Sequence, residues 1–258
     1  MRLLISTLVL GLSLSTALAA DIAVPPGSDA QERLAEALIN AQSGDTIWLG
    51  IGRYELSDGL SLDVDDVSLR GIGPDSSILS FSGQKGSGEG LLVTSDRVTL
   101  AGFAVENSKG DGIKSKGSDT ITFRDIRVEW TGGPKAENGA YGLYPVSSKN
   151  VLIENSLVRG ASDAGIYVGQ SENIVVRNNV AEYNVAGIEI ENSFKADVHG
   201  NTARHNTGGI PDFRPAKPAQ QGRRDIRVFD NDLVDNDTEG DFCARRAILL
   251  RWSQRAWA

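Results

Sequence analysis

Lysine, tyrosine and carboxylate side chains recur at fixed places around a series of glycines. The residue two places after the glycine is Lys114, Tyr144, Tyr167 or Glu189 in four successive repeats, and Asp111 and Asp163 stand just before their glycines. Neighbouring tyrosines on a strand face offer flat, amphipathic rings for stacking against sugars, with phenolic groups for hydrogen bonds. These six residues predict a shallow substrate-binding surface for a glycan, floored by Tyr144 and Tyr167. The alternative is an aromatic ladder that only stabilises strand stacking.

Catalysis on an acidic polysaccharide is a second interpretation of the same residues. A lyase or C5-epimerase needs a base that takes the proton beside a uronate carboxyl and a cation that neutralises the developing charge. Lys114 or Tyr167 could be the base, whereas no arginine or calcium cluster stands where the cation is needed. The catalytic residues therefore stay unassigned, and binding of a glycan or a partner protein is the first hypothesis.

The sequence offers one weak metal signal. Asp235–Gly240 partly matches the opening of a calcium loop, but the twelfth position is Arg246, where a bidentate glutamate is required. An Asn/Asp-rich corner is the simpler interpretation. Neither a metal nor a cofactor is expected.

A glycine followed by an apolar residue recurs with nearly constant spacing and sets the phase of these side chains. The pairs begin at Gly90, Gly112, Gly142, Gly165, Gly187 and Gly209, at intervals of 22, 30, 23, 22 and 22 residues. Each unit holds a short apolar strand, a polar turn, an alternating strand, an Asn-containing corner and a third short strand. One such unit cannot bury its apolar side alone, so the units must stack.

Aligning the units on their glycines gives columns of residues that are expected to lie on the same face of a sheet. Two inner columns follow a period of two: Ile121, Val151, Ile174 and Ala196; Phe123, Ile153, Val176 and Val198. Two outer columns alternate in charge and predict ion-pair ladders, in which His199 is structural: Arg124, Glu154, Arg177 and His199; Glu129, Arg159, Glu182 and Arg204. Corner asparagines predict an amide ladder along the axis: Asn155, Asn178, Asn179 and Asn201.

Three short strands per unit and no room for a crossover helix predict an all-β fold, a single-stranded right-handed parallel β-helix with rungs of about 22 residues. Ankyrin and leucine-rich repeats need helical or Leu-heavy units, which this chain lacks. Two longer insertions, Thr131–Gly139 and Arg214–Gly222, are expected to flank the sheet that carries the tyrosines, where a rigid coil usually places binding loops.

The run from Gly44 to Gly71, followed by the glycine-phased units, resembles the pectin-lyase-like superfamily, and this resemblance covers roughly residues 30 to 240. More narrowly, Gly139–Pro145, Ala161–Gly169 and Val185–Asn192 are similar to exported parallel β-helix repeat proteins, a family of unsettled function. The paired aspartates and Gly-His-Gly of pectin hydrolases and the Asp-Pro-His-Asp of alginate epimerases are missing. By resemblance to other exported β-helices, a role as an accessory factor in metal or redox protein maturation is kept as a third function.

The two ends of the chain differ from the repeats. Residues 1–20 have the charged start, apolar stretch and small-residue cleavage site of a signal peptide, which predicts a periplasmic or secreted protein without a membrane span. Residues 21–43 are expected to form a cap whose helix starts with a Ser28–Gln31 capping box, followed by the coil over 44–240. Residues 241–258 lose the glycine phase, as in a truncated or out-of-frame tail. The net charge of −8 argues against nucleic acid as a partner.

Overall fold

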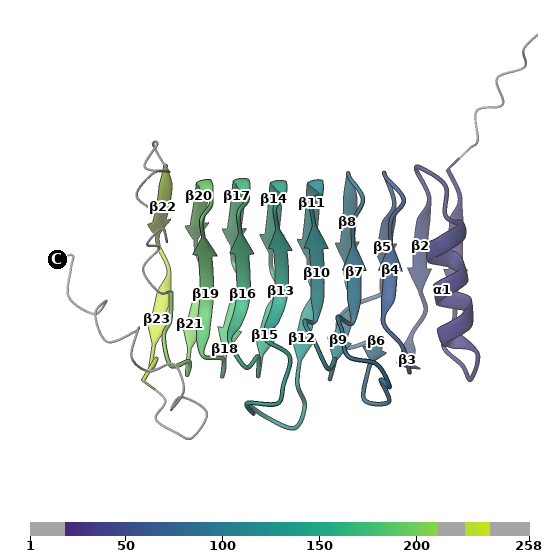
Figure 1. The fold of residues 1–258 in the computed structure, drawn as a ribbon, viewed down its shortest axis with the longest axis horizontal. Helices are drawn as coiled ribbons and strands as arrows, with labels where there is room; N and C mark the ends of the chain where they lie inside the picture. Colours follow the sequence, from purple (N-terminus) through teal and green to yellow (C-terminus); the bar gives the residue numbers. More distant parts are fainter. Residues whose placement is uncertain (1–18, 211–224, 238–258) are drawn as a thin grey trace, which may run out of the picture.

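The structure is a computed structural model that describes residues 19–210 and 225–237. Within them the chain winds as a parallel coil of three sheets, with helix α1 (Ala30–Asn40) across the N-terminal end (Figure 1). The predicted right-handed parallel β-helix is confirmed. The signal-like segment up to residue 18, the second insertion at 214–222, and the tail at 241–258 lie outside the described residues.

The three sheets run the length of the coil and hold one strand from nearly every rung. Sheet A contains β1 (Asp21–Val24), β2 (Thr46–Leu49), β5 (Ser68–Arg70), β8 (Val98–Ala101), β11 (Asp119–Arg124), β14 (Lys149–Glu154), β17 (Glu172–Arg177), β20 (Phe194–His199) and β22 (Ile226–Phe229). Sheet B contains β3 (Gly52–Glu55), β6 (Ser77–Ser80), β9 (Ala104–Glu106), β12 (Arg127–Glu129), β15 (Leu157–Arg159), β18 (Val180–Glu182), β21 (Thr202–Arg204) and β23 (Asp232–Val234). Sheet C contains β4 (Leu60–Leu62), β7 (Leu91–Val93), β10 (Ile113–Lys116), β13 (Tyr141–Val146), β16 (Ala164–Gly169) and β19 (Ala186–Glu191).

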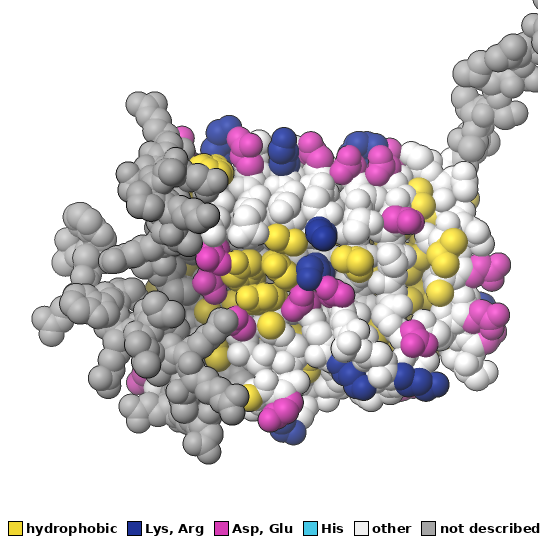
Figure 2. Space-filling view, in the orientation of Figure 1, with side chains coloured by type: hydrophobic (Ala, Val, Ile, Leu, Met, Phe, Trp, Pro, Cys, Tyr) yellow, Lys and Arg dark blue, Asp and Glu magenta, His cyan; other side chains and the backbone are white. Residues whose placement is uncertain are grey.

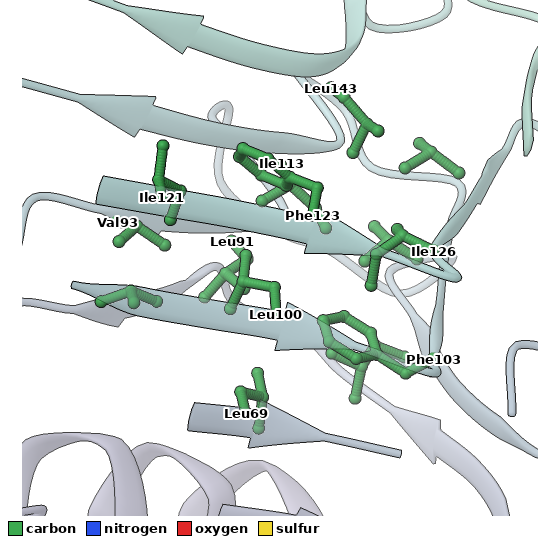
Figure 3. Packing of buried hydrophobic residues seen from close by; sticks show 14 of the residues in the cluster. Leu69, Leu91, Val93, Leu100, Phe103, Ile113, Ile121, Phe123, Ile126 and Leu143 are labelled. Atoms are coloured by element: carbon green, nitrogen blue, oxygen red, sulfur yellow. The ribbon is translucent and has the colours of Figure 1, made fainter. Parts of the chain in front are cut away.

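The core is a stack of apolar residues inside the coil. Ile121, Val151 and Ile174 are successive Cα partners across sheet A, and all three are buried, so the predicted inner column is confirmed. Figure 3 shows side chains from both sheet A and sheet C meeting in this interior, among them Leu100 and Ile113. Strands with one apolar side therefore gain their stability only by closing the coil and stacking rungs.

Helix α1 covers the open end of the coil with the expected face. Leu34, Ala37 and Leu38 are buried against the first rungs. The predicted capping box is wrong: the helix begins one residue later, at Ala30, and its N-cap residue Asp29 makes no side-chain capping bond. Asp29 pairs with Arg33, and the Gln31 side chain accepts hydrogen bonds from the backbone N–H groups of residues 57 and 58, because these loop donors need a partner.

Polar ladders fix the register of the rungs. The Asn201 side chain accepts hydrogen bonds from Asn179 at 2.9 and 3.0 Å and donates to Asn231 at 2.9 Å, which confirms the corner ladder for Asn179 and Asn201. A second ladder, unpredicted, joins the buried Asn184 and Asn206 to the partly buried Asn236. The predicted corner residues Asn155 and Asn178 instead occupy the left-handed region, at φ 53° and 56°.

The outer charge columns form the predicted ion pairs. The Glu154 carboxylate lies between Arg124 at 2.5 Å and Arg177 at 2.6 Å. On sheet B, Glu182 lies between Arg159 at 2.8 Å and Arg204 at 2.7 Å. Burial by itself raises the pKa of Glu154, but the hydrogen bonds from the two arginines outweigh it and leave the pKa below its usual range. His199 stacks on Phe229, consistent with a structural role.

Candidate functional site

Sheet C brings the predicted column together on its outer face. Lys114 and Tyr144 are Cα partners across β10 and β13, and Tyr167 and Glu189 are Cα partners across β16 and β19. The Tyr144 and Tyr167 rings meet edge to face, with their centroids 5.1 Å apart. Figure 2 shows a hydrophobic patch in the middle of this face, with basic and acidic side chains together on one side and acidic ones on the other.

A third tyrosine, missed by the sequence analysis, completes the cluster. The Tyr141 ring lies 4.7 Å from that of Tyr144 and 4.5 Å from that of Tyr167, centroid to centroid. The three rings pack on Ala164 and Ala186 as an apolar cluster separate from the core of the coil. We call Tyr141, Tyr144 and Tyr167 the tyrosine surface.

Tyr167 lies at the base of the tyrosine surface. Only 7% of Tyr167 is exposed, whereas Tyr141 and Tyr144 are half-buried. Its ring lies against Gly169, where a Cβ would sit 2.7 Å from a ring carbon, and its hydroxyl donates to Glu191. The expectation that Tyr167 offers an open face beside Tyr144 is therefore wrong, because the accessible ring area belongs to Tyr141 and Tyr144.

Lys114 borders the tyrosine surface with its charge already paired. Its Nζ lies 2.9 Å from Glu89 Oε1, 3.5 Å from Asp111 Oδ2 and 4.9 Å from the centroid of the Tyr144 ring. Burial lowers the pKa of Lys114, but the hydrogen bond and charge of Glu89 outweigh burial and raise the pKa above its ordinary value. Lys114 is thus a fixed cation and a poor general base at neutral pH.

The predicted carboxylates have different environments. Asp111 accepts a hydrogen bond from the Tyr141 N–H at 3.2 Å, and burial raises the pKa of its carboxyl despite the nearby Lys114 charge. Asp163 is buried, and its backbone joins the rungs on both sides, through Ala140 and Ala186. Glu189 is partly buried on β19, on the far side of the tyrosines from Lys114.

Tyr167 is also poorly suited to act as a base. Burial and the hydrogen bond to Glu191 raise the pKa of Tyr167 far above its usual value, because an ionised phenol there would lie beside a carboxylate in a poorly solvated place. The arrangement favours holding a neutral, amphipathic ligand against the rings over abstracting a proton. Its chemistry is that of stacking and hydrogen bonding.

Two of the residues missed by the sequence analysis carried a readable signal. Glu89 directly precedes its glycine, as Asp111 does, and Glu191 follows Glu189 by two places on the same face. Tyr141 was hidden, because strict alternation from the inward-facing Leu143 would turn it into the core. The strand start escapes that alternation, and the ring packs outside.

The first insertion lies beside sheet C, as predicted. It connects β12 on sheet B with β13 on sheet C and projects from the coil in Figure 1. Trp130, next to it, is buried, and its indole N–H donates to the Ser108 carbonyl at 2.7 Å. Asn138 donates to the carbonyls of Gly133 and Gly160 at 2.9 and 2.6 Å, which ties the loop to the next rung.

Comparison with known proteins supports the same class of fold. A coil of parallel three-sheet rungs is the architecture of pectin-lyase-like β-helices, and the sequence model described as the right-handed beta helix region matches residues 73–211, more than half of the chain. The chain belongs to this right-handed β-helix family. No curated protein matches it significantly in sequence.

Solved structures of similar fold include proteins that act on polysaccharides. The A-module of mannuronan C-5 epimerase AlgE4 from Azotobacter vinelandii has a TM-score of 0.62 and 18% identity, over 83% of this chain and 68% of that one. Alginate lyase from Paenibacillus sp. str. FPU-7 has a TM-score of 0.54 and 16% identity, over 86% and 99%. Bacteriophage phi29 gene product 12 has a TM-score of 0.60 and 17% identity, over 73% and 29%. At these identities the likeness establishes the fold.

The described part of the chain contains no helix long and apolar enough to cross a membrane. Within the same residues, no three His, Cys, Asp or Glu side chains gather closely enough to hold a metal ion. The weak calcium-loop match begins in the described part, at Asp235, and continues beyond it.

Proposed function

We propose that this protein binds a glycan outside the cytoplasm, on the tyrosine surface of sheet C. The observation that carries the proposal is the separate apolar cluster of three tyrosines, whose rings contact one another on the outer face of the coil. Pyranose rings have apolar C–H faces that pack on tyrosine, and phenolic hydroxyls can bond their polar edges. The extracytoplasmic setting is supported by the signal-like residues 1–20.

The charges around the tyrosine surface favour a neutral part of the glycan at this place. Glu89 and Asp111 already surround Lys114, and Glu191 lies on the other side of the rings. A carboxylate on the bound sugar would meet these acids, and the exposed Lys116 at the rim of β10 already acts on Glu89. An uncharged sugar would lose none of the existing pairs.

An epimerase or lyase acting on an acidic glycan is the second candidate, supported by the fold of the alginate-active structures. The raised pKa values of Lys114 and Tyr167 weigh against it, because neither group would accept a proton from a uronate near neutral pH. Binding therefore stands ahead of catalysis.

Isothermal titration calorimetry with a panel of neutral and acidic oligosaccharides tests the proposal. The double variant Tyr141→Ala/Tyr144→Ala should bind at least roughly tenfold more weakly than the wild type, a loss of about 1.4 kcal/mol. Tyr183→Ala is the matched control, because Tyr183 is exposed and stacks on His205 away from the cluster. Equal affinity of the double variant and the wild type would remove the proposal. Unsaturated ends or epimerised units in the same samples would favour the enzyme.

A further inference from the structure

A second surface, on sheet A near the helical end, has a cation without a partner. Among the ten arginines within residues 19–210 and 225–237, Arg70 on β5 is the one that takes part in no ion pair or side-chain hydrogen bond. The chain has a net charge of −8, so carboxylates are plentiful elsewhere. A partly buried guanidinium left open on such a molecule is a place for an anion from outside.

The outer column that contains Arg70 is rich in arginine. Its Cα partners run from Trp48 to Arg70, then Ala101, Arg124 and Glu154. The next partner is Arg177, and Glu154 pairs with Arg124 and Arg177, so the one buried carboxylate of the column is not available to Arg70. The remaining acids at this place are Asp21, bonded to the Trp48 indole, and the exposed Asp125.

Ala101 opens a gap between Arg70 and Arg124. Rungs are about 4.8 Å apart, so the two arginine Cα atoms lie roughly 10 Å from each other with only a methyl group between them. The gap belongs to a depression of about 480 Å³ that Trp48 and Ile72 also line. At its floor the backbones of Gly71 and Gly102 touch, since a Cβ on Gly71 would lie 2.3 Å from the Gly102 carbonyl oxygen. Side chains are thereby kept out of the floor.

Trp48 gives the depression a fixed flat wall. Its indole N–H donates to Asp21 Oδ1 at 2.8 Å, and 37% of the residue is exposed. Ile72, which is 58% exposed, adds apolar area. A flat ring and a free guanidinium one rung apart match a sugar that has both an apolar face and a carboxylate.

We propose that the depression formed by Trp48, Arg70 and Arg124 binds uronate units of an acidic polysaccharide. The sugar ring packs on Trp48, and its carboxylate forms a charge-assisted pair with Arg70, with Arg124 contributing positive potential. This site is independent of the tyrosine surface, and the two select opposite parts of a glycan: a neutral sugar on sheet C and a carboxylated one on sheet A.

Titration with a hexauronate and with the uncharged cellohexaose tests this inference. The wild type should bind the hexauronate in a salt-dependent manner, and Arg70→Gln and Trp48→Ala should each weaken binding at least roughly tenfold, or about 1.4 kcal/mol. Arg97→Gln is the control, because Arg97 is a half-exposed arginine already paired with Asp65 and Asp66. Tyr141→Ala/Tyr144→Ala should retain hexauronate binding, which separates this site from the tyrosine surface.

Three results would overturn the inference. The first is hexauronate affinity unchanged in Arg70→Gln, and the second is no wild-type binding at millimolar hexauronate. The third is equal affinity for a sulfated hexasaccharide, which would assign the depression to anions in general. A circular dichroism spectrum of each variant that matches the wild-type spectrum shows that folded proteins are being compared.

Discussion

Replacing Asn201 by alanine should remove the centre of a buried amide ladder. Asn201 is 1% exposed, follows the end of β20, and holds together the rungs on both sides. Its side chain accepts from the Asn179 N–H at 2.9 Å and donates to the Val176 carbonyl, also at 2.9 Å. Alanine satisfies neither group.

The cost follows from those two backbone groups. Each buried polar group that loses its partner destabilises the fold by about 1–3 kcal/mol, so Asn201→Ala should lower the free energy of unfolding by roughly 2–6 kcal/mol. The Asn179 amide keeps its bond to the Ile153 carbonyl, and Asn231 keeps its bond to the Asn201 N–H, so the loss is confined to one corner. Urea unfolding followed by far-UV circular dichroism measures it.

Asn173→Gly is the matched control. Asn173 donates to Asn150 at 3.1 Å in an exposed amide pair and has φ 57°, a conformation that glycine adopts freely. Removing this exposed amide should change the free energy of unfolding by under about 1 kcal/mol. If Asn201→Ala and Asn173→Gly cost the same, burial is not what makes the corner ladder stabilising, and the reasoning fails.

Two further perturbations address the tyrosine surface. Burial raises the pKa of Asp111, so the native state keeps this proton to higher pH than the unfolded chain, and Asp111 costs stability increasingly as pH rises from about 3.9 through the raised pKa. Asp111→Asn keeps an acceptor for the Tyr141 N–H, and its stability relative to the wild type, measured by urea unfolding, should increase over that interval; a gap constant with pH would contradict this. Gly169→Ala places a Cβ 2.7 Å from the Tyr167 ring and should displace that ring. The near-UV circular dichroism should then change, and glycan binding should weaken. Unchanged spectra and affinity would show that the positions of the rings do not depend on Gly169.

The coil itself could be predicted because its determinants repeat. One misplaced residue in a single rung changes the predicted register little, because several other rungs indicate the same register. The inner column through Ile121 and Val151 follows from the spacing alone. The ion-pair columns could be predicted for the same reason, since opposite charges one rung apart must face each other in a parallel sheet.

The candidate sites were harder to predict because they depend on what does not repeat. Tyr141 stands at a strand start, where alternation fails, and the depth of Tyr167 depends on a glycine two places later in its own strand. The depression at Arg70 depends on a small residue, Ala101, in the neighbouring rung, and Arg70 itself precedes Gly90, the first of the phased glycines. Such features need the three-dimensional register before they become visible.

Departures from pairing point to ligand sites on a β-helix, since pairing is its default. On sheet B, Glu182 is bracketed by two arginines, and such a column has no charge left for a ligand. The sheet A column follows the same rule from Arg177 to Arg124 and then breaks it, because alanine occupies the place where a carboxylate would bridge Arg124 and Arg70. Ala101→Glu would supply that missing partner and occupy Arg70. The small side chain at position 101 therefore controls whether Arg70 can accept an external carboxylate.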